Sequence, residues 1–430
     1  MKQYAEYKDS RVEWIGKVPK DWEIKKNRYI LTRVKNIVDT NEKDFPVLSL
    51  SIQGVIEKDR EDNTGKIPAV YANYYQIVKE NHLLLCLFDM DVTPCLVGYI
   101  KKTGIISPAY SYFEPFLNGS ICSKYYYYWY LRMHKENLFI QLSNNVRNSI
   151  NNDDFKNIVA PYPPLETQRK IADYLDKKID AIDTLITDKQ KLIDLLKEKR
   201  QAIISEAVTK GLDKNAKMKD SGIEWIGKVP EHWSIKKLSY ITQSLSGGTP
   251  SRDRSDYWEN GSIPWMSSGE INNEYIRETK EYITSLGMQN SNAKLLPVHT
   301  VMMALNGQGK TKGMTAILEI ETTCNQSLVG FICDKQKINY EYLFYSLKTM
   351  YKYVRSLVGD ESREGLSVSF LKEQRIAVPP LIEQDMIVKD IKIRIQNLDE
   401  LSENIELQIE KLKEYRQSII SEAVTGKVAI

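Results

Sequence analysis

The sequence predicts an α+β protein with two domains of mixed α/β type, separated by two long antiparallel helices that form a coiled coil. Three observations lead to this fold class. The ends of the two halves of the chain repeat closely, the middles of the halves share little, and each half closes on an uninterrupted helical pattern. The architecture should therefore have an internal pseudo-twofold repeat.

The repeat is clearest at the two ends of each half. Residues 8–26 return as 219–237 with 14 of 19 positions identical, and 196–209 return as 412–425 with two changes. The offsets are 211 and 216, so the second half has gained about five residues between these motifs. The period is far longer than the roughly 20–50 residues of solenoid repeats. Shared ends indicate a shared structural role, and divergent middles indicate two different targets.

The order of segments follows from the repeat. We expect an N-terminal motif at 1–19, a variable domain at 20–164, a spacer helix at 165–208, a linker with the second motif at 209–230, a second variable domain at 231–380, and a second spacer helix with a tail at 381–430.

Aromatic residues gather in two kinds of place. The segments 124–131 and 341–347 align at the 216 offset, and we interpret both as helices with aromatic core faces rather than as base-stacking platforms. Four tryptophans repeat with the frame of the two halves, and we expect them to anchor each copy against a helix end: Trp14, Trp22, Trp225 and Trp233.

The spacer helices carry apolar residues at spacings of three and four and contain neither Gly nor Pro. Each spans 44 residues, or roughly 65 Å, so it should overhang a domain of ordinary size. Packing on its own domain is the alternative, but pairing of the two helices buries more of each apolar face. The predicted coil core, or partner-docking set, is Ile171, Leu175, Ile179, Ile182, Leu185, Leu192, Leu196, Ile203, Ile387, Ile391, Ile395, Leu398, Leu401, Ile405, Ile409, Leu412 and Ile419.

Composition restricts the function class. Of 430 residues, 60 are Lys or Arg and 57 are Asp or Glu. The net charge of +3 is too small to indicate a nucleic-acid-binding protein by itself. The helix 165–208 nets 0 and the helix 381–424 nets −4, so the rest of the chain carries +7. No apolar run reaches the roughly 18 residues of a membrane span, and no signal peptide is evident. We therefore expect a cytoplasmic protein without membrane contact.

No residue pattern indicates catalysis, a bound cofactor or a metal. The five cysteines are scattered and the four histidines are isolated. The segment 307–311 resembles part of a phosphate loop, but Ala304 stands where the Walker motif needs glycine. A glycine turn that presents Gln308, Lys310 and Lys312 to a polyanion and a plain hairpin turn remain open readings. Pro163–Pro164 and Pro379–Pro380 lack the polar and aromatic neighbours of an adenine methyltransferase motif.

The joint order of motifs resembles the specificity subunit of type I restriction–modification systems over nearly the whole chain. The resemblance is carried by Glu-Trp-Ile-Gly-Lys-Val-Pro in both copies, by Pro-Pro-Leu followed by Gln at each helix start, and by the shared helix ends. Further matches are 246–251, 263–271, 306–313, 323–326 and 107–110.

The resemblance implies that each variable domain is a target-recognition domain for one half of a bipartite, asymmetric double-stranded DNA sequence. The helices would set the spacer and dock two methyltransferase subunits, which carry S-adenosylmethionine. Two restriction and translocase subunits, which use ATP and magnesium, would join them. The chain itself would be non-catalytic and hold no cofactor.

Polar and basic residues in expected loops are the candidates for contacts with bases or phosphates. They are Gln53, Lys58, Arg60, Lys66, Arg147, Arg252, Ser267, Gln308, Lys310, Lys312, Asn325 and Arg363. A solvated surface role is the alternative for each of them. Two other functions remain open at this point: an adapter that bridges proteins without DNA, and an enzyme whose site is not visible in the sequence.

Overall fold

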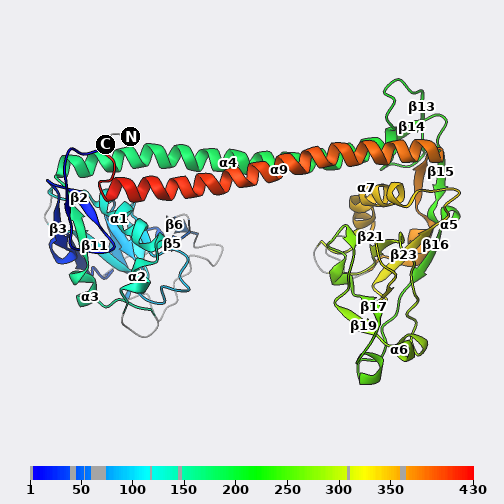
Figure 1. Cartoon of the computed structure of the whole chain (residues 1–430), viewed down its shortest axis with the longest axis horizontal. Helices are drawn as coiled ribbons and strands as arrows, with labels where there is room; N and C mark the ends of the chain where they lie inside the picture. The colour runs from blue at the N-terminus through cyan, green and yellow to red at the C-terminus, as the bar shows by residue number, and fades with distance from the viewer. Residues whose placement is uncertain are drawn as a thin grey trace. The chain divides into compact units, whose positions relative to one another are not determined.

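The computed structural model describes residues 3–38, 45–52, 54–59, 74–116, 119–143, 148–307, 310–358 and 365–430. It divides into two compact units (Figure 1). Unit 1 comprises Met1–Gln190 with Glu406–Ile430, and unit 2 comprises Lys191–Ile405. Two long helices, α4 (Leu165–Lys210) and α9 (Leu381–Val424), contribute residues to both units.

The described part of unit 1 has two four-stranded sheets, in the orders β6-β5-β10-β7 and β4-β11-β8-β9, and two strand pairs, β1-β2 and β12-β3. The helices α1 and α3 lie beside these sheets (Figure 1). The elements are β1 (Tyr7–Asp9), β2 (Lys17–Pro19), β3 (Glu23–Lys26), β4 (Leu31–Val34), β5 (Val47–Ser51), β6 (Gly54–Lys58), β7 (Gln76–Val78), β8 (Leu83–Leu85), β9 (Val97–Tyr99), β10 (Gly104–Ile106), β11 (Ser111–Pro115), α1 (Ser123–Lys135), α2 (Leu138–Gln141), α3 (Asn152–Asn157) and β12 (Val159–Tyr162).

The described part of unit 2 has a five-stranded sheet, β16-β23-β20-β21-β18, a three-stranded sheet, β19-β17-β22, and the pairs β13-β14 and β15-β24. Its elements are β13 (Met218–Asp220), β14 (Lys228–Pro230), β15 (Ser234–Lys237), α5 (Leu238–Ile241), β16 (Thr242–Ser246), β17 (Ile263–Met266), β18 (Tyr275–Ile276), β19 (Glu281–Ile283), α6 (Ser285–Gln289), β20 (Val301–Ala304), β21 (Thr315–Leu318), β22 (Thr323–Cys324), β23 (Leu328–Cys333), α7 (Tyr340–Val358), α8 (Val368–Glu373) and β24 (Arg375–Val378).

The repeated motifs build the same frame in both units. The hairpin β1-β2 corresponds to β13-β14, and the pair β3-β12 corresponds to β15-β24. In the sheets, β4-β11-β8 corresponds to β16-β23-β20, with the same antiparallel pairing. The pseudo-twofold repeat that the sequence predicts is therefore a repeat of structure, and the variable residues are grafted onto a shared frame.

Two of the four repeated tryptophans close their unit against a helix end, as predicted. A Cβ added at Gly426, just after α9, would lie 2.4 Å from Pro19 Cδ and 3.0 Å from the Trp22 ring. One added at Gly211, just after α4, would lie 3.0 Å from the Trp233 ring. Because both glycines have positive φ, they also suit the left-handed turn that ends a helix.

The prediction was wrong for the other two tryptophans. The ring of Trp14 packs on Trp129 of α1 at 5.7 Å, and that of Trp225 packs on Tyr353 of α7 at 6.0 Å. They therefore anchor the motif to the helix of the variable domain rather than to the end of a spacer helix.

The aromatic segments form helix faces in the core, as the sequence indicates. In α1, Tyr125, Tyr126, Trp129 and Tyr130 are fully buried. The buried hydroxyl groups all find acceptors: Tyr125 donates to the Val424 carbonyl oxygen at 2.9 Å, Tyr126 to that of Pro161 at 3.2 Å, and Tyr130 to Asn27 Oδ1 at 2.7 Å. Because all four rings are buried within the fold, they are not available for stacking on bases.

The long helices pair in antiparallel order inside each unit. In unit 1, Arg416 Nε lies 3.0 Å from Asp183 Oδ1, and Lys189 Nζ donates to Gln408 Oε1 at 2.5 Å. In unit 2, Arg200 Nε lies 3.6 Å from Asp399 Oδ1. Partner numbers fall along α9 as they rise along α4, which confirms the antiparallel coiled coil.

The seam of this coil follows a strict alternation of four and three residues, and its positions on α9 are those on α4 shifted by 216. All seam residues are buried or half-buried: Gln168, Ala172, Leu175, Ile179, Ile182, Ile186, Lys189, Ile193, Leu196, Arg200, Ile203 and Ala207, with their counterparts from Gln384 to Ala423.

Three predicted core residues are wrong. Leu185, Leu192 and Leu401 are 45%, 42% and 45% exposed. The seam instead takes the residue after each of them, and at 402 that residue is a serine. At 185–186 and 192–193 a run of two apolar residues does not reveal which of them faces the partner helix. At 401–402 the heptad register places the serine in the seam although the leucine is the apolar residue. The predicted Ile171 and Ile387 are buried, although they lie one position off the seam.

Candidate nucleic-acid interface and domain-docking contacts

Six of the twelve predicted DNA-contact residues lie outside the described residues: Gln53, Arg60, Lys66, Arg147, Gln308 and Arg363. The other six are described. Lys58, at the end of β6, is half-buried and pairs with Val47 in the β5-β6 ladder. Its position in a strand differs from the loop that the sequence suggested.

The glycine turn before β21 has one exposed lysine and one buried lysine. Lys310 is exposed, and its carbonyl oxygen accepts a hydrogen bond of 2.7 Å from the Tyr351 hydroxyl of α7. Lys312 is only 4% exposed, and its carbonyl oxygen accepts from Arg355 Nη1 at 3.2 Å. The prediction that Lys312 faces a polyanion is therefore wrong, because the segment folds back onto α7. The described chain after the turn continues into the strand β21 rather than a helix, which agrees with the exclusion of a phosphate loop.

Two motifs that stand far apart in the sequence meet at one place in unit 2. Gly248 N donates to the Cys324 carbonyl oxygen at 2.8 Å, and Thr249 Oγ1 donates to Gln326 Oε1 at 2.6 Å. A Cβ at Gly247 would lie 2.0 Å from that carbonyl oxygen, so only glycine allows this approach. Asn325 Oδ1 accepts from Ser327 N at 3.1 Å, which shapes the loop before β23.

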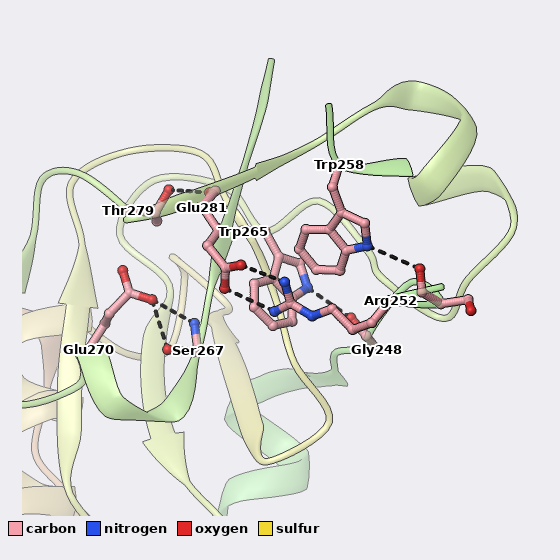
Figure 2. A network of polar contacts seen from close by, with 9 residues as sticks. Gly248, Arg252, Trp258, Trp265, Ser267, Glu270, Thr279 and Glu281 are labelled. Atoms are coloured by element: carbon pink, nitrogen blue, oxygen red, sulfur yellow. Dashed lines mark hydrogen bonds and ion pairs between the residues drawn. The ribbon is translucent and has the colours of Figure 1, made fainter. Parts of the chain in front are cut away.

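Arg252 is held in a fixed position beside this meeting point (Figure 2). Its guanidinium donates to both carboxylate oxygens of Glu281, at 2.5 and 2.9 Å, and its Cζ lies 3.6 Å from the centroid of the Trp258 ring. The hydrogen bond with Glu281 raises the pKa of Arg252 and lowers that of Glu281. The sequence did not single out Glu281 or Trp258, whose roles depend on contacts across 29 and 6 residues.

Ser267 has a capping role. Its hydroxyl donates to Glu270 Oε1 at 2.9 Å, and its backbone N–H donates to the same oxygen at 2.8 Å. Glu270 Oε2 accepts from Lys280 N at 3.0 Å (Figure 2 shows the Ser267–Glu270 bonds). Both Arg252 and Ser267 are thus bonded to carboxylates, so any ligand that contacts them has to replace or extend those bonds.

A buried glutamine joins each variable domain to its spacer helix. Gln168 Oε1 accepts from Cys122 N at 2.9 Å, just before α1, and its Nε2 donates to the Pro163 carbonyl oxygen at 2.8 Å. Gln384 does the same in unit 2, with Asn339 N at 2.7 Å and the Pro379 carbonyl oxygen at 2.9 Å. This is the Gln that follows Pro-Pro-Leu in the repeated motif, and it fixes the start of α1 or α7 against the coil.

Glu274 forms a second joint in unit 2. Its carboxylate accepts from Arg200 of α4 at 2.9 Å and pairs with Lys348 of α7. Burial by itself would raise the pKa of Glu274, but attraction to Lys348 and then to Arg200 outweighs burial and holds that pKa below its usual range. The cluster therefore keeps an ionised carboxylate between the variable domain and the coil.

The described residues contain no group of three or more His, Cys, Asp or Glu side chains able to hold a metal ion. All five cysteines are free thiols. Within the same residues, no helix is both long and apolar enough to cross a membrane.

Comparison with known proteins shows that both halves of the chain match the same family model. A family model described as the type I restriction modification DNA specificity domain matches residues 19–195 and 230–411. The putative type I restriction enzyme MjaX specificity subunit of Methanocaldococcus jannaschii is 24% identical, with coverage of 97% of this chain and 96% of the relative. The type I restriction enzyme EcoR124I/EcoR124II specificity subunit of Escherichia coli is 26% identical, with coverage of 69% and 70%.

Two solved structures share the fold. A chain from a study of complex assembly and conformational transition of the type I R-M system superimposes with a TM-score of 0.72 at 13% identity, with coverage of 95% of this chain and 98% of that chain. The HsdS subunit from Thermoanaerobacter tengcongensis superimposes with a TM-score of 0.56, at the same identity and coverage.

Proposed function

Because this chain belongs to the family of type I restriction modification DNA specificity domains, we propose that it is the DNA sequence-recognition subunit of a type I restriction–modification complex. One observation carries the proposal. Both halves of the chain match the family model and build the same frame, yet their variable residues differ. Each variable domain reads one half of a bipartite, asymmetric DNA target, and the chain itself performs no chemical step.

The distribution of charge supports a reader that works with partners. Residues 20–164 hold 18 basic and 16 acidic side chains, a net of +2, and 231–380 hold 17 and 16, a net of +1. Such weak fields give little grip on the phosphate backbone, which usually supplies much of the affinity. In our proposal, two methyltransferase subunits, which bring S-adenosylmethionine, supply the remaining affinity for the phosphate backbone. Two restriction and translocase subunits with ATP and magnesium complete the complex.

The paired helices set the distance between the two half-sites and dock the methyltransferase subunits. Two observations support these roles. The helices α4 and α9 are continuous, and residues 381–424 have a net charge of −4, which suits protein partners better than DNA. A bipartite reader also gains affinity when both half-sites are engaged at once, provided that the spacing between its domains matches the spacer.

The test is selection of bound duplexes from a random pool by the chain together with its methyltransferase partner. We expect enrichment of two short sequence blocks separated by a spacer of constant length. If no sequence is enriched, or if the chain binds its protein partner but no DNA, an adapter that bridges proteins would be favoured. Transfer of a methyl group by the purified chain alone would favour an enzyme.

A further inference from the structure

An open hollow of about 630 Å³ lies on the variable domain of unit 1. It is lined by β4, by the residues after β8, by the loop before β11 and by the start of α3. The loop before β11 contains Pro108 and Ala109, part of the 107–110 motif that the sequence singled out. None of the DNA-contact residues predicted from the sequence is among the residues that line this hollow.

Arg33 is the cation of this hollow. It is exposed on β4 opposite Phe113 of β11, and its side chain has no hydrogen-bond or ion-pair partner within the described residues. In unit 2, Arg252 and Arg254 are each bonded to a carboxylate on their own surface. The guanidinium of Arg33 thus keeps its full set of donors for a ligand.

Asn152 and Phe88 complete the lining. Asn152 is the first residue of α3, but its neighbour Asn151 caps the helix by accepting from Asp153 N and Asp154 N. The Oδ1 atom of Asn152 is buried and has no hydrogen-bond partner among the described residues, an arrangement that costs free energy until a donor reaches it. Phe88 is 41% exposed and lines the same hollow.

Unit 2 has the same frame here with other side chains. Ile150 N donates to the Leu87 carbonyl oxygen at 2.9 Å in unit 1, and Leu366 N donates to that of Leu305 at 2.8 Å in unit 2. Counted from this shared bond and from the sheet register, the counterparts of Arg33, Phe88 and Asn152 are Ser244, Asn306 and Val368. The frame is kept and all three lining residues are exchanged, as expected at a place where two domains read different targets.

We propose that this hollow reads a G·C base pair of the half-site bound by the first variable domain. Arg33 donates both arms of its guanidinium to guanine O6 and N7, the commonest specific contact in the major groove. The Asn152 side chain turns its buried, unpaired Oδ1 out into the hollow to accept from the N4 amino group of the paired cytosine, and Phe88 makes an apolar contact with the neighbouring base. The inference rests on the proposed function, and it names one base pair and the side chains that select it.

The experiment compares duplex selection by the chain with its methyltransferase partner for the wild type, Arg33→Ala, Arg33→Lys and Asn152→Ala. The control is Lys101→Ala, which removes an exposed cation of the same domain outside the hollow. Arg33→Ala should reduce the preference for one G·C pair by about 5- to 150-fold. Arg33→Lys should lose most of the same preference although it keeps the charge, because lysine lacks the planar fork. Asn152→Ala should weaken the preference at the same pair.

The second half-site, read by unit 2, serves as an internal reference and should stay unchanged in every variant. Equal weakening on all sequences by Arg33→Ala, with full rescue by Arg33→Lys, would mean a phosphate contact and would overturn the proposal. So would an unchanged preference in both Arg33→Ala and Asn152→Ala. Failure of the wild type to select any bipartite sequence would instead remove the proposed function. Melting curves of the variants separate these outcomes from misfolding.

Discussion

The register of the coil predicts opposite outcomes for two adjacent residues of α4. Ile193 lies in the seam and is 2% exposed, whereas Leu192 is 42% exposed. Large-to-small substitution of a buried Ile costs about 2–5 kcal/mol, and a two-helix seam can relax into the space, so we expect about 2–3 kcal/mol for Ile193→Ala. Leu192→Ala should cost less than about 1 kcal/mol, because the side chain is nearly half exposed and Ala favours helix.

Thermal unfolding followed by circular dichroism measures the difference. Unit 2 comprises Lys191–Ile405, and for a domain of this size 1 kcal/mol shifts Tm by about 2–4 °C. Ile193→Ala should therefore lower the Tm of the transition that includes the coil by about 4–12 °C, and Leu192→Ala by less than about 4 °C. The pair Ile405→Ala and Leu401→Ala repeats the comparison on α9. An equal or larger loss from Leu192→Ala would refute the seam.

Three further predictions concern the joints and the spacer. The pKa of Glu274 is lower in the fold than its usual 4.5, so the ionised carboxylate contributes fully to stability above pH 4.5 and loses that contribution as pH falls through the folded pKa. Between pH 6 and 3 the melting temperature should therefore fall more steeply for the wild type than for Glu274→Gln, and parallel curves would contradict this. Removal of seven residues from each long helix at matched seam positions shortens the coil by about 10 Å, so methylation mapping should find a spacer shorter by about three base pairs at 3.4 Å each with both half-sites unchanged; an unchanged spacer would argue against a ruler. Gly426→Ala should destabilise unit 1 more than Gly211→Ala destabilises unit 2, because the added Cβ meets Pro19 at 2.4 Å but its counterpart meets Trp233 at 3.0 Å; the reverse order of melting shifts would exclude this packing.

The aromatic segments show where sequence patterns were sufficient. The run 125–130 and its counterpart in 341–347 repeat at the offset of the helices. Residues that repeat with the frame serve the frame, and both segments are indeed core helices. The same reasoning placed all four repeated tryptophans at helix ends, which was correct for Trp22 and Trp233 and wrong for Trp14 and Trp225.

The predicted DNA-contact residues show where sequence patterns were insufficient. Lys312 and Lys310 are two residues apart in one glycine-rich turn, yet one is buried under α7 and the other is exposed. Arg252 looked like a free cation, but Glu281 and Trp258 fix it. Arg33, Phe88 and Asn152 were missed because they come from three separate segments and carry no shared motif.

The sequence by itself determined the duplication, the two long helices and the family resemblance, because these are written as repeats and periodicities within continuous stretches of chain. Only the tertiary structure decided which of two adjacent residues faces the partner helix, which lysine is buried, and which side chains share a hollow. Those outcomes depend on the heptad register, on the fold-back of a turn onto α7 and on strand pairing. Such contacts join residues that are distant in the chain and leave no local pattern to find.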